Sequence, residues 1–391
     1  MPVEILSRRE TLRRLAAAAT VAAMGTRLSG AQGVKAPIGD GAQLTDLGME
    51  LSAQQRAAGI ALLKQHVSVD THSHPGRFFL RDLPYQTPTT RAFGEPFEQQ
   101  AIADLNAGNV SATLFSAVSD MQLLEMTPAQ GMHAAGDFKP GDAYADYRRQ
   151  LAALKSLAAA YTGGAGLTPA DIDSAHRRGK TAAVFAVEGG DFIEDRLERV
   201  HEAFGDGVRA VTLVHYHINQ IGDIQTEAPA HGGLTALGKS IVAEMNKTGV
   251  IMDLAHATFD VTKDVLEISA KPIMISHTNI ATATFNHPRL ISTEHAKLAA
   301  AAGGIIGSWP SGVGQATFSD YIDSIRRLVD TVGIDHVAIG TDMDANFRPV
   351  LRSYRDWSLI PAALLARGMH EQEAAKIMGG NFLRVFKANL S

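Results

Sequence analysis

The chain has 391 residues, of which 45% are hydrophobic and 20% are charged, a composition typical of globular proteins. Asp and Glu (41) outnumber Lys and Arg (36), and no basic segment with interleaved aromatic residues follows the first few residues, so nucleic acid is not expected as a partner. The absence of cysteine excludes disulfides, thiol nucleophiles and thiolate metal sites, so any metal ion must bind to histidine and carboxylate side chains. No apolar run reaches the length of about 18 residues that a membrane span requires, and the sequence predicts none.

The first 31 residues are typical of an export signal. The pair Arg8-Arg9 and further arginines precede an alanine-rich stretch over 15–24, and Ser29-Gly30-Ala31 provides a small-x-small cleavage site. The arginines resemble the twin-arginine signal, with Thr11 where a large apolar residue is usual. An amphipathic first helix is the alternative, but alanines offer little apolar surface to bury. We expect 1–31 to be a twin-arginine-type signal peptide and the mature protein to be exported, either periplasmic or extracellular.

From about residue 66 onward, short apolar, β-branched runs alternate with longer amphipathic stretches. The runs number eight and cover 66–70, 110–118, 181–187, 208–214, 250–255, 272–276, 304–308 and 336–340. Helix-start signals such as Thr168-Pro169, Thr258 and Ser292 lie between them. This alternation predicts a parallel sheet covered by helices, and eight units favour a closed (β/α)8 TIM-type barrel of the α/β class; a doubly wound open sheet is the alternative.

The rest of the chain is assigned relative to this barrel. Residues 32–65 are expected to be a lead-in segment with a helix and a strand, and 66–391 a barrel catalytic domain that ends in C-terminal helices. Two stretches, 76–98 and 121–142, exceed a minimal barrel, and we expect them to cover its mouth. The helical pattern of the C-terminal segments fits packing within one subunit and packing in a homodimer equally well.

Active sites of such barrels lie at the carboxyl-terminal ends of the strands. Six of the 15 histidines fall there: His72, His74, His215, His217, His256 and His277. Acidic residues at these ends include Glu188, Asp342 and Asp344.

Five of these residues have the chemistry of a metal site. His72 and His74 alternate along one strand, so both rings are expected to face the mouth of the barrel. Glu188, His256 and His277 arrive from other strands and converge on the same axis. Imidazole and carboxylate groups bind Zn²⁺ or a similar cation, and these donors suffice for two ions that share Glu188.

Each residue alone also has a structural interpretation. A strand-end histidine is commonly hydrogen-bonded within the fold, Glu188 and Asp342 are each suited to cap a helix, and Arg289 after Pro288 fits a surface position. The joint arrangement on several strands favours the metal site.

These residues, in this order, resemble the membrane dipeptidase (renal dipeptidase) family of zinc-dependent, amidohydrolase-like barrel peptidases. The resemblance extends from about residue 66 to the end, and its most specific segments are 233–256, 275–279, 287–289, 340–344 and 379–385. It implies two zinc ions, one held by His72, the residue at position 74 and Glu188, and the other by Glu188, His256 and His277.

The resemblance also assigns roles in catalysis and substrate binding. It implies that His215 polarises the scissile carbonyl, that Arg289 binds the terminal carboxylate of the substrate, and that Asp342 transfers the proton. Glu188, His215 and Asp342 are then the catalytic residues. The chain departs from the family at position 74, where an aspartate is usual and His74 stands here, which removes one negative charge from the site. We expect a site that still binds metal, with one ion held more tightly than the other.

The resulting hypothesis is an exported metallodipeptidase. It hydrolyses the amide bond of small peptide substrates, including dipeptides with a D-residue at the C-terminal position, through a metal-bridging hydroxide. One alternative is an amidohydrolase for another small amide, an N-acyl amino acid or a lactone. Another is a non-catalytic metal-binding protein, which would need neither His215 nor Asp342.

Overall fold

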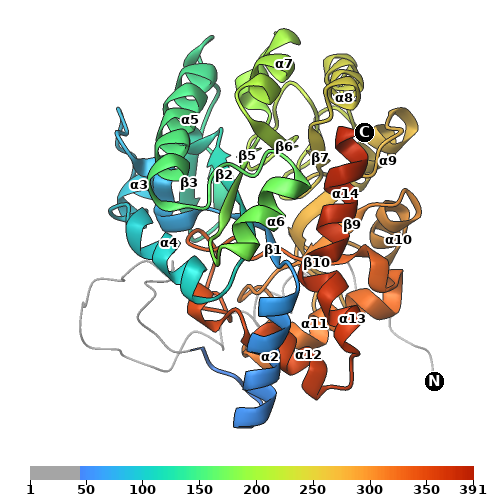
Figure 1. Ribbon diagram of the computed structural model, residues 1–391. Coiled ribbons are helices and arrows are strands. Elements are labelled where there is room, and N and C mark those ends of the chain that lie inside the picture. Colours follow the sequence, from blue (N-terminus) through green and yellow to red (C-terminus); the bar gives the residue numbers. More distant parts are fainter. Residues whose placement is uncertain (1–44) are drawn as a thin grey trace, which may run out of the picture. The chain divides into compact units, whose positions relative to one another are not determined.

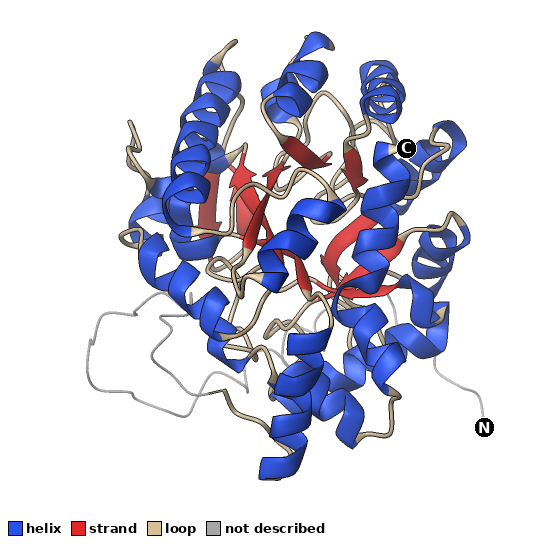
Figure 2. Cartoon of the chain, viewed as in Figure 1, coloured by secondary structure: helices blue, strands red, loops and turns tan. Residues whose placement is uncertain are grey.

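The computed structural model describes residues 45–391, and eight parallel strands in it close into a barrel with helices outside (Figures 1 and 2). In spatial order the strands are β1 (Val69–Ser73), β2 (Ala112–Val118), β5 (Ala182–Glu188), β6 (Val208–Thr212), β7 (Ile251–Asp253), β8 (Met274–Thr278), β9 (Ile305–Ser308) and β10 (Val337–Ile339). Because β1 pairs in parallel with both β2 and β10, the sheet has no edge. The predicted (β/α)8 barrel is confirmed, and the open doubly wound sheet is excluded.

The described helices include three that begin at start signals read from the sequence. The helices are α2 (Ala53–Gln65), α3 (Pro88–Phe93), α4 (Glu98–Ala107), α5 (Asp142–Tyr161), α6 (Pro169–Arg177), α7 (Glu198–Gly205), α8 (Ala236–Thr248), α9 (Phe259–Ile268), α10 (Thr293–Ala301), α11 (Phe318–Val332), α12 (Leu359–Ala366), α13 (Glu371–Ala375) and α14 (Asn381–Leu390). The side chains of Thr168, Thr258 and Ser292 each accept a backbone N–H in the first turn of α6, α9 and α10. None of the described helices has the length and apolarity to cross a bilayer.

The first strand lies further along the chain than its apolar run suggested. The expected strand covered 66–70, whereas β1 is Val69–Ser73. Polar residues continue the strand because their side chains are paired inside the protein: the hydroxyls of Thr341 and Tyr354 donate to Asp70, and Ser73 shares a hydrogen bond of 2.6 Å with Thr113. Hydrogen-bonded polar groups can be buried at little cost, so hydrophobicity alone misplaced this strand.

The barrel is filled by alternate residues of the strands and closed at its amino-terminal end by α14. Phe382, Val385 and Phe386 of that helix pack with the first residues of several strands, such as Val69 and Ile305. In Figure 1, α14 lies next to β9 and β10. This end of the barrel is sealed by apolar packing, which leaves the carboxyl-terminal end for the site.

Two excursions rise from the carboxyl ends of β1 and β2, as predicted. Residues 76–98 form most of the 3₁₀ helix η2 (Pro75–Leu80) and α3, and residues 121–142 form a two-stranded hairpin, β3 (Leu124–Thr127) with β4 (Gly131–Ala134), that the sequence did not indicate. Both excursions line the cavity at the mouth of the barrel.

In the described part of the lead-in segment, the predicted helix is α2, and residues 45–52 contain no strand. The division into 1–31, 32–65 and 66–391 remains a prediction, and the export signal lies outside the described residues.

Candidate functional site

Glu188 is the last residue of β5 and lies at the centre of the site. Period-two alternation along β5 places it on the same face as Val184 and Ala186, which pack inside the barrel. Its side chain is 2% exposed, so the carboxylate has almost no water around it. A buried carboxylate requires charged or hydrogen-bonding partners, and four histidines of the predicted site supply them.

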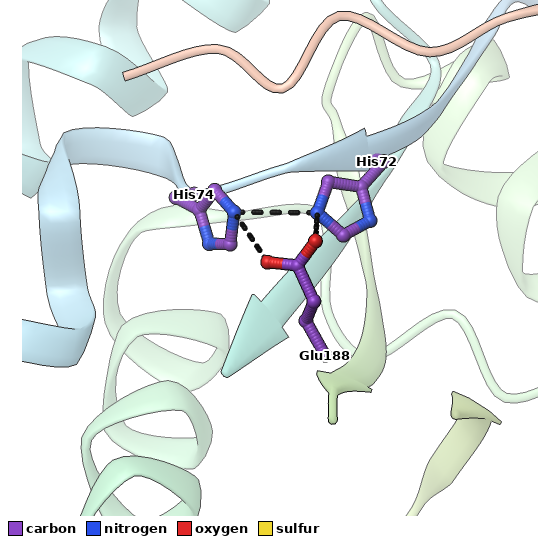
Figure 3. A group of neighbouring side chains, drawn as sticks. All are labelled: His72, His74 and Glu188. Atoms are coloured by element: carbon purple, nitrogen blue, oxygen red, sulfur yellow. Dashed lines mark hydrogen bonds and ion pairs between the residues drawn. The ribbon is translucent and has the colours of Figure 1, made fainter. Parts of the chain in front are cut away.

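The first group of donors is His72, His74 and Glu188 (Figure 3). The Nε2 atoms of the two imidazoles are 3.2 Å apart, and they lie 3.2 and 3.4 Å from separate oxygens of Glu188. The pairing of β1 with β2 shifts register between Asp70 and Ser73, directly beside His72. The rings come from the end of β1 and the residue that follows it, and both point at the carboxylate.

The second group is Glu188, His256 and His277. The Nε2 atoms of His256 and His277 are 3.1 Å apart and lie 3.2 and 3.6 Å from the same Oε1 of Glu188. All five residues of the two groups are buried. The structure therefore brings together every residue that the sequence nominated as a metal ligand, with Glu188 common to both groups.

The hydrogen bonds of the first group suit a cation. Nδ1 of His74 lies 2.7 Å from the carbonyl oxygen of Ser116, so Nδ1 carries the hydrogen, and in neutral His74 the lone pair of Nε2 faces Glu188. Burial opposes a charge on this ring, but Asp342 and Glu188 together raise the pKa of His74 to about 10. The site thus stabilises positive charge at Nε2, the atom from which a metal ion would displace a proton.

The second group keeps its imidazoles neutral. Burial, together with the positive charge of Arg289, holds the pKa of His256 well below its usual value, and burial with the charge of His72 does the same for His277. Burial alone would raise the pKa of Glu188, yet the charges of His215 and His72 hold it well below the ordinary range. Neutral imidazoles beside an ionised carboxylate are the donor set that Zn²⁺ accepts.

Two residues of the site have strained backbones. His256 has φ 66° and Asp342 has φ 55°, a left-handed region that non-glycine residues adopt at a cost of about 1–3 kcal/mol. Asp342 is fixed there by its N–H, which donates to the carbonyl of His72 at 2.8 Å. The fold holds both side chains toward the mouth against their local preference.

The three remaining predicted residues surround these groups. Nε2 of His215 lies 3.4 Å from Oε2 of Glu188, and Oδ1 of Asp342 lies 3.3 Å from Nε2 of His74. Arg289 is 2% exposed, and its Nη2 lies 3.0 Å from Nε2 of His256. His217, which the sequence also placed at a strand end, contacts Asp191 at 2.6 Å and lies apart from both donor groups.

Asp120, two residues past the end of β2, was missed by the sequence reasoning. One oxygen of this fully buried carboxylate lies 2.7 Å from Nδ1 of His215, and the other accepts the N–H of Tyr216 at 3.1 Å. Although burial opposes a charge on His215, Asp120 and Glu188 raise its pKa above the ordinary value. The position of Asp120 just after a strand end was the available signal. In the sequence, however, a single acidic residue at such a position cannot be distinguished from one that caps a helix.

A cavity of about 310 Å³ opens above the donors. Glu188, His74, His215, Arg289 and Asp342 line its polar part. The volume suits a small ligand rather than a protein chain.

A family model of the membrane dipeptidases (peptidase family M19) matches residues 56–390. The chain belongs to the membrane dipeptidase family. Among curated relatives, the dipeptidase verJ of Clonostachys rogersoniana is 28% identical over 349 residues, which cover 86% of this chain and 88% of that protein. The predicted family and enzyme class, a metal-dependent dipeptidase that hydrolyses peptide bonds, are confirmed.

Solved structures show the same fold. The probable dipeptidase PvdM from Pseudomonas aeruginosa aligns with a TM-score of 0.70 at 20% identity, covering 86% of this chain and 98% of that one. A metallo peptidase from Rhodobacter sphaeroides, liganded with a phosphinate mimic of L-Ala-D-Ala, aligns with a TM-score of 0.69 at 18% identity, covering 83% and 99%. The barrel is thus shared with structures of the family.

Proposed function

We propose that this membrane dipeptidase family member hydrolyses dipeptides with two zinc ions, one in each donor group. The observation that carries the proposal is the convergence of four buried imidazoles on one buried carboxylate, beside His215, Asp342 and Arg289. When bound, a pair of divalent cations supplies an acidic water at neutral pH and polarises a carbonyl oxygen. Zinc fits this donor set, because all five ligands are imidazole nitrogen or carboxylate oxygen.

Arg289 anchors the substrate in this proposal. Its guanidinium is held by the side-chain oxygen of Gln225 at 2.8 Å and lies over the ring of Trp309 at 5.4 Å. Arg289 lines the cavity, so its guanidinium is placed to pair with a terminal carboxylate. Anchored there, a dipeptide places its amide about one residue away, over the donor groups.

His215 and Asp342 act on the reacting atoms. Nε2 of His215 faces the cavity while Nδ1 donates to Asp120. Asp120 and Glu188 favour the protonated ring, in which Nε2 also carries a hydrogen and donates to the carbonyl oxygen, where negative charge develops. Asp342 is 15% exposed, so its carboxylate reaches both the cavity and the donor groups. We assign it the transfer of a proton from the attacking water to the leaving amine, which would otherwise depart as an anion.

The departure at position 74 makes the two ion sites unequal. The second group resembles the ordinary family arrangement, whereas the first has one carboxylate fewer. We propose that the two groups therefore hold their ions with unequal affinity, because replacing the usual carboxylate by the imidazole of His74 changes the charge of the first group alone.

The substrate class includes D-residues at the C-terminal position. The Rhodobacter structure is liganded with a phosphinate mimic of L-Ala-D-Ala, and an arginine anchor pairs with the terminal carboxylate, a group that L- and D-residues share. Purified protein loaded with zinc should hydrolyse both L-Ala-L-Ala and L-Ala-D-Ala, and dialysis against a chelator should abolish both activities. Hydrolysis of N-acetyl amino acids but of no dipeptide would overturn the proposal in favour of another amidohydrolase.

Export and oligomeric state complete the proposal. We propose that the leader directs the mature enzyme out of the cytoplasm and that the C-terminal helices support a homodimer. Fractionation of cells that produce the full chain should find the shortened protein outside the cytoplasm, and light scattering should give twice the monomer mass. A cytoplasmic or monomeric protein would contradict the respective proposal.

A further inference from the structure

The polar donors of the site adjoin an apolar cluster that is separate from the barrel core. Its buried members are Phe79, Leu80, Phe93, Val118, Met121 and Leu124, and Met132 and Tyr216 pack against them. Most of these residues come from the two excursions, and most also line the cavity. The excursions therefore build one wall of the site from aromatic rings and flexible thioethers, side chains that adapt to apolar ligands.

The aromatic rings of the first excursion lie beside the first donor group, whereas Arg289 lies beside the second. Arg289 contacts His256 of the second group, and Glu188 connects this group to the first. Beyond them, the ring of His74 packs edge-on against Phe79 at 5.5 Å, and Phe79 packs against Phe93 at 5.4 Å. A substrate held by its carboxylate at Arg289 thus extends across the donor groups toward the apolar wall.

The wall carries no charge. The excursion residues that line the cavity are Phe79, Phe93, Met121, Leu124, Met126, Gln130, Gly131 and Met132. The acidic residues among the described lining residues are Glu188 and Asp342, which the proposed function already uses. A charged side chain placed against this wall would lose its hydration without gaining a partner.

We propose that the wall selects a large apolar side chain on the N-terminal residue of the dipeptide, the residue that contributes the scissile carbonyl. This inference rests on the proposed function, because Arg289 fixes which half of the substrate meets the wall. The preferred substrates are dipeptides that begin with phenylalanine, leucine or methionine. Glycine at this position leaves the wall unfilled, and lysine or aspartate is rejected.

The test is the kcat/KM of the zinc-loaded enzyme for Phe-Ala, Leu-Ala, Gly-Ala, Lys-Ala and Asp-Ala. Burial of a large apolar side chain predicts a kcat/KM for Phe-Ala about 10- to 100-fold above that for Gly-Ala, with Lys-Ala and Asp-Ala no better than Gly-Ala. In the reverse series, Ala-Phe and Ala-Gly should differ by less than this. Similar rates for all five peptides would overturn the inference alone, whereas hydrolysis of none would overturn the proposed function with it.

Two variants locate the selectivity in the hairpin. Met132 lies on β4 opposite Met126 of β3, and Met126 is 43% exposed, so a polar replacement there is compatible with folding. Met132→Asp and Met126→Asp should each lower the ratio of kcat/KM for Phe-Ala to that for Lys-Ala by about tenfold or more. Ile60→Asp, at a position 39% exposed on α2, is the matched control and should leave the ratio unchanged. A ratio that neither hairpin variant shifts would place the selectivity elsewhere.

Discussion

Replacing Asp120 with asparagine should reduce kcat while leaving the metal content intact. Asp120 is completely buried, and its two oxygens accept from Nδ1 of His215 at 2.7 Å and from the N–H of Tyr216 at 3.1 Å. Asparagine has nearly the same shape but only one accepting oxygen. Either Tyr216 or His215 must then face an amide NH₂, and the negative charge that favours a positively polarised His215 is lost.

The size of the effect follows from the kind of interaction removed. A hydrogen bond to a charged group contributes about 1.5–3 kcal/mol, more when the group is buried. If His215 meets the negative charge that develops on the carbonyl oxygen, the loss appears in the transition state, and kcat should fall about 10- to 150-fold. KM should change by less than about threefold, because ground-state binding relies on Arg289.

The assay measures kcat and KM for a dipeptide together with zinc per chain. Asp137→Asn is the matched control, because Asp137 is 95% exposed and lies 3.3 Å from the neighbouring histidine, His217. It should retain full kcat. If Asp120→Asn keeps full kcat with its zinc bound, Asp120 does not position His215 for catalysis, and the role assigned to His215 fails with it.

Three further predictions test other parts of the account. Asp342→Asn should lower kcat about 10²- to 10⁴-fold with unchanged zinc content, and unaltered hydrolysis would remove Asp342 from proton transfer. His74→Asp restores the carboxylate usual in the family and should tighten zinc binding by the first group about tenfold or more; equal zinc affinity in titrations of both proteins would contradict the role given to charge at this position. Burial lowers the pKa of His295 on α10 from 6.5 to about 4. The fold therefore loses roughly 3 kcal/mol of stability as the pH falls from about 6.5 toward about 4, because the unfolded chain takes up a proton before the folded one does. His295→Leu should therefore lose less stability than the parent over this range in urea unfolding, and parallel pH profiles would refute the assignment.

The barrel was predictable because its strands are buried on both faces. Each strand is a short apolar run between helix signals, and eight such runs leave few other arrangements. The convergence of the donors followed from the same rule, because Glu188, His256 and His277 each stand at or just past a strand end. The closed barrel could therefore be predicted without knowing the conformation of the loops.

The parts that were missed depend on loops. The β3–β4 hairpin consists of two four-residue strands that include exposed residues such as Glu125, so it lacks the alternating pattern of a half-buried strand. It is stabilised instead by the packing of Leu124 in the apolar cluster. Arg289 lies eleven residues beyond the end of β8, so its contact with His256 depends on a loop conformation that sequence spacing does not determine. The start of β1 was misplaced because Asp70 and Ser73 are buried through hydrogen bonds to residues on other elements, Asp70 to Thr341 and Tyr354 and Ser73 to Thr113. A hydrophobicity pattern does not reveal such bonds.

The most direct test of the account is an anomalous diffraction map, collected at the zinc edge, from crystals of the active enzyme. Two peaks should appear about 2.0–2.2 Å from their ligands, one among His72, His74 and Glu188 and the other among Glu188, His256 and His277. A map from fully active crystals with no peak within bonding distance of these five side chains would contradict the metal site and the mechanism built on it.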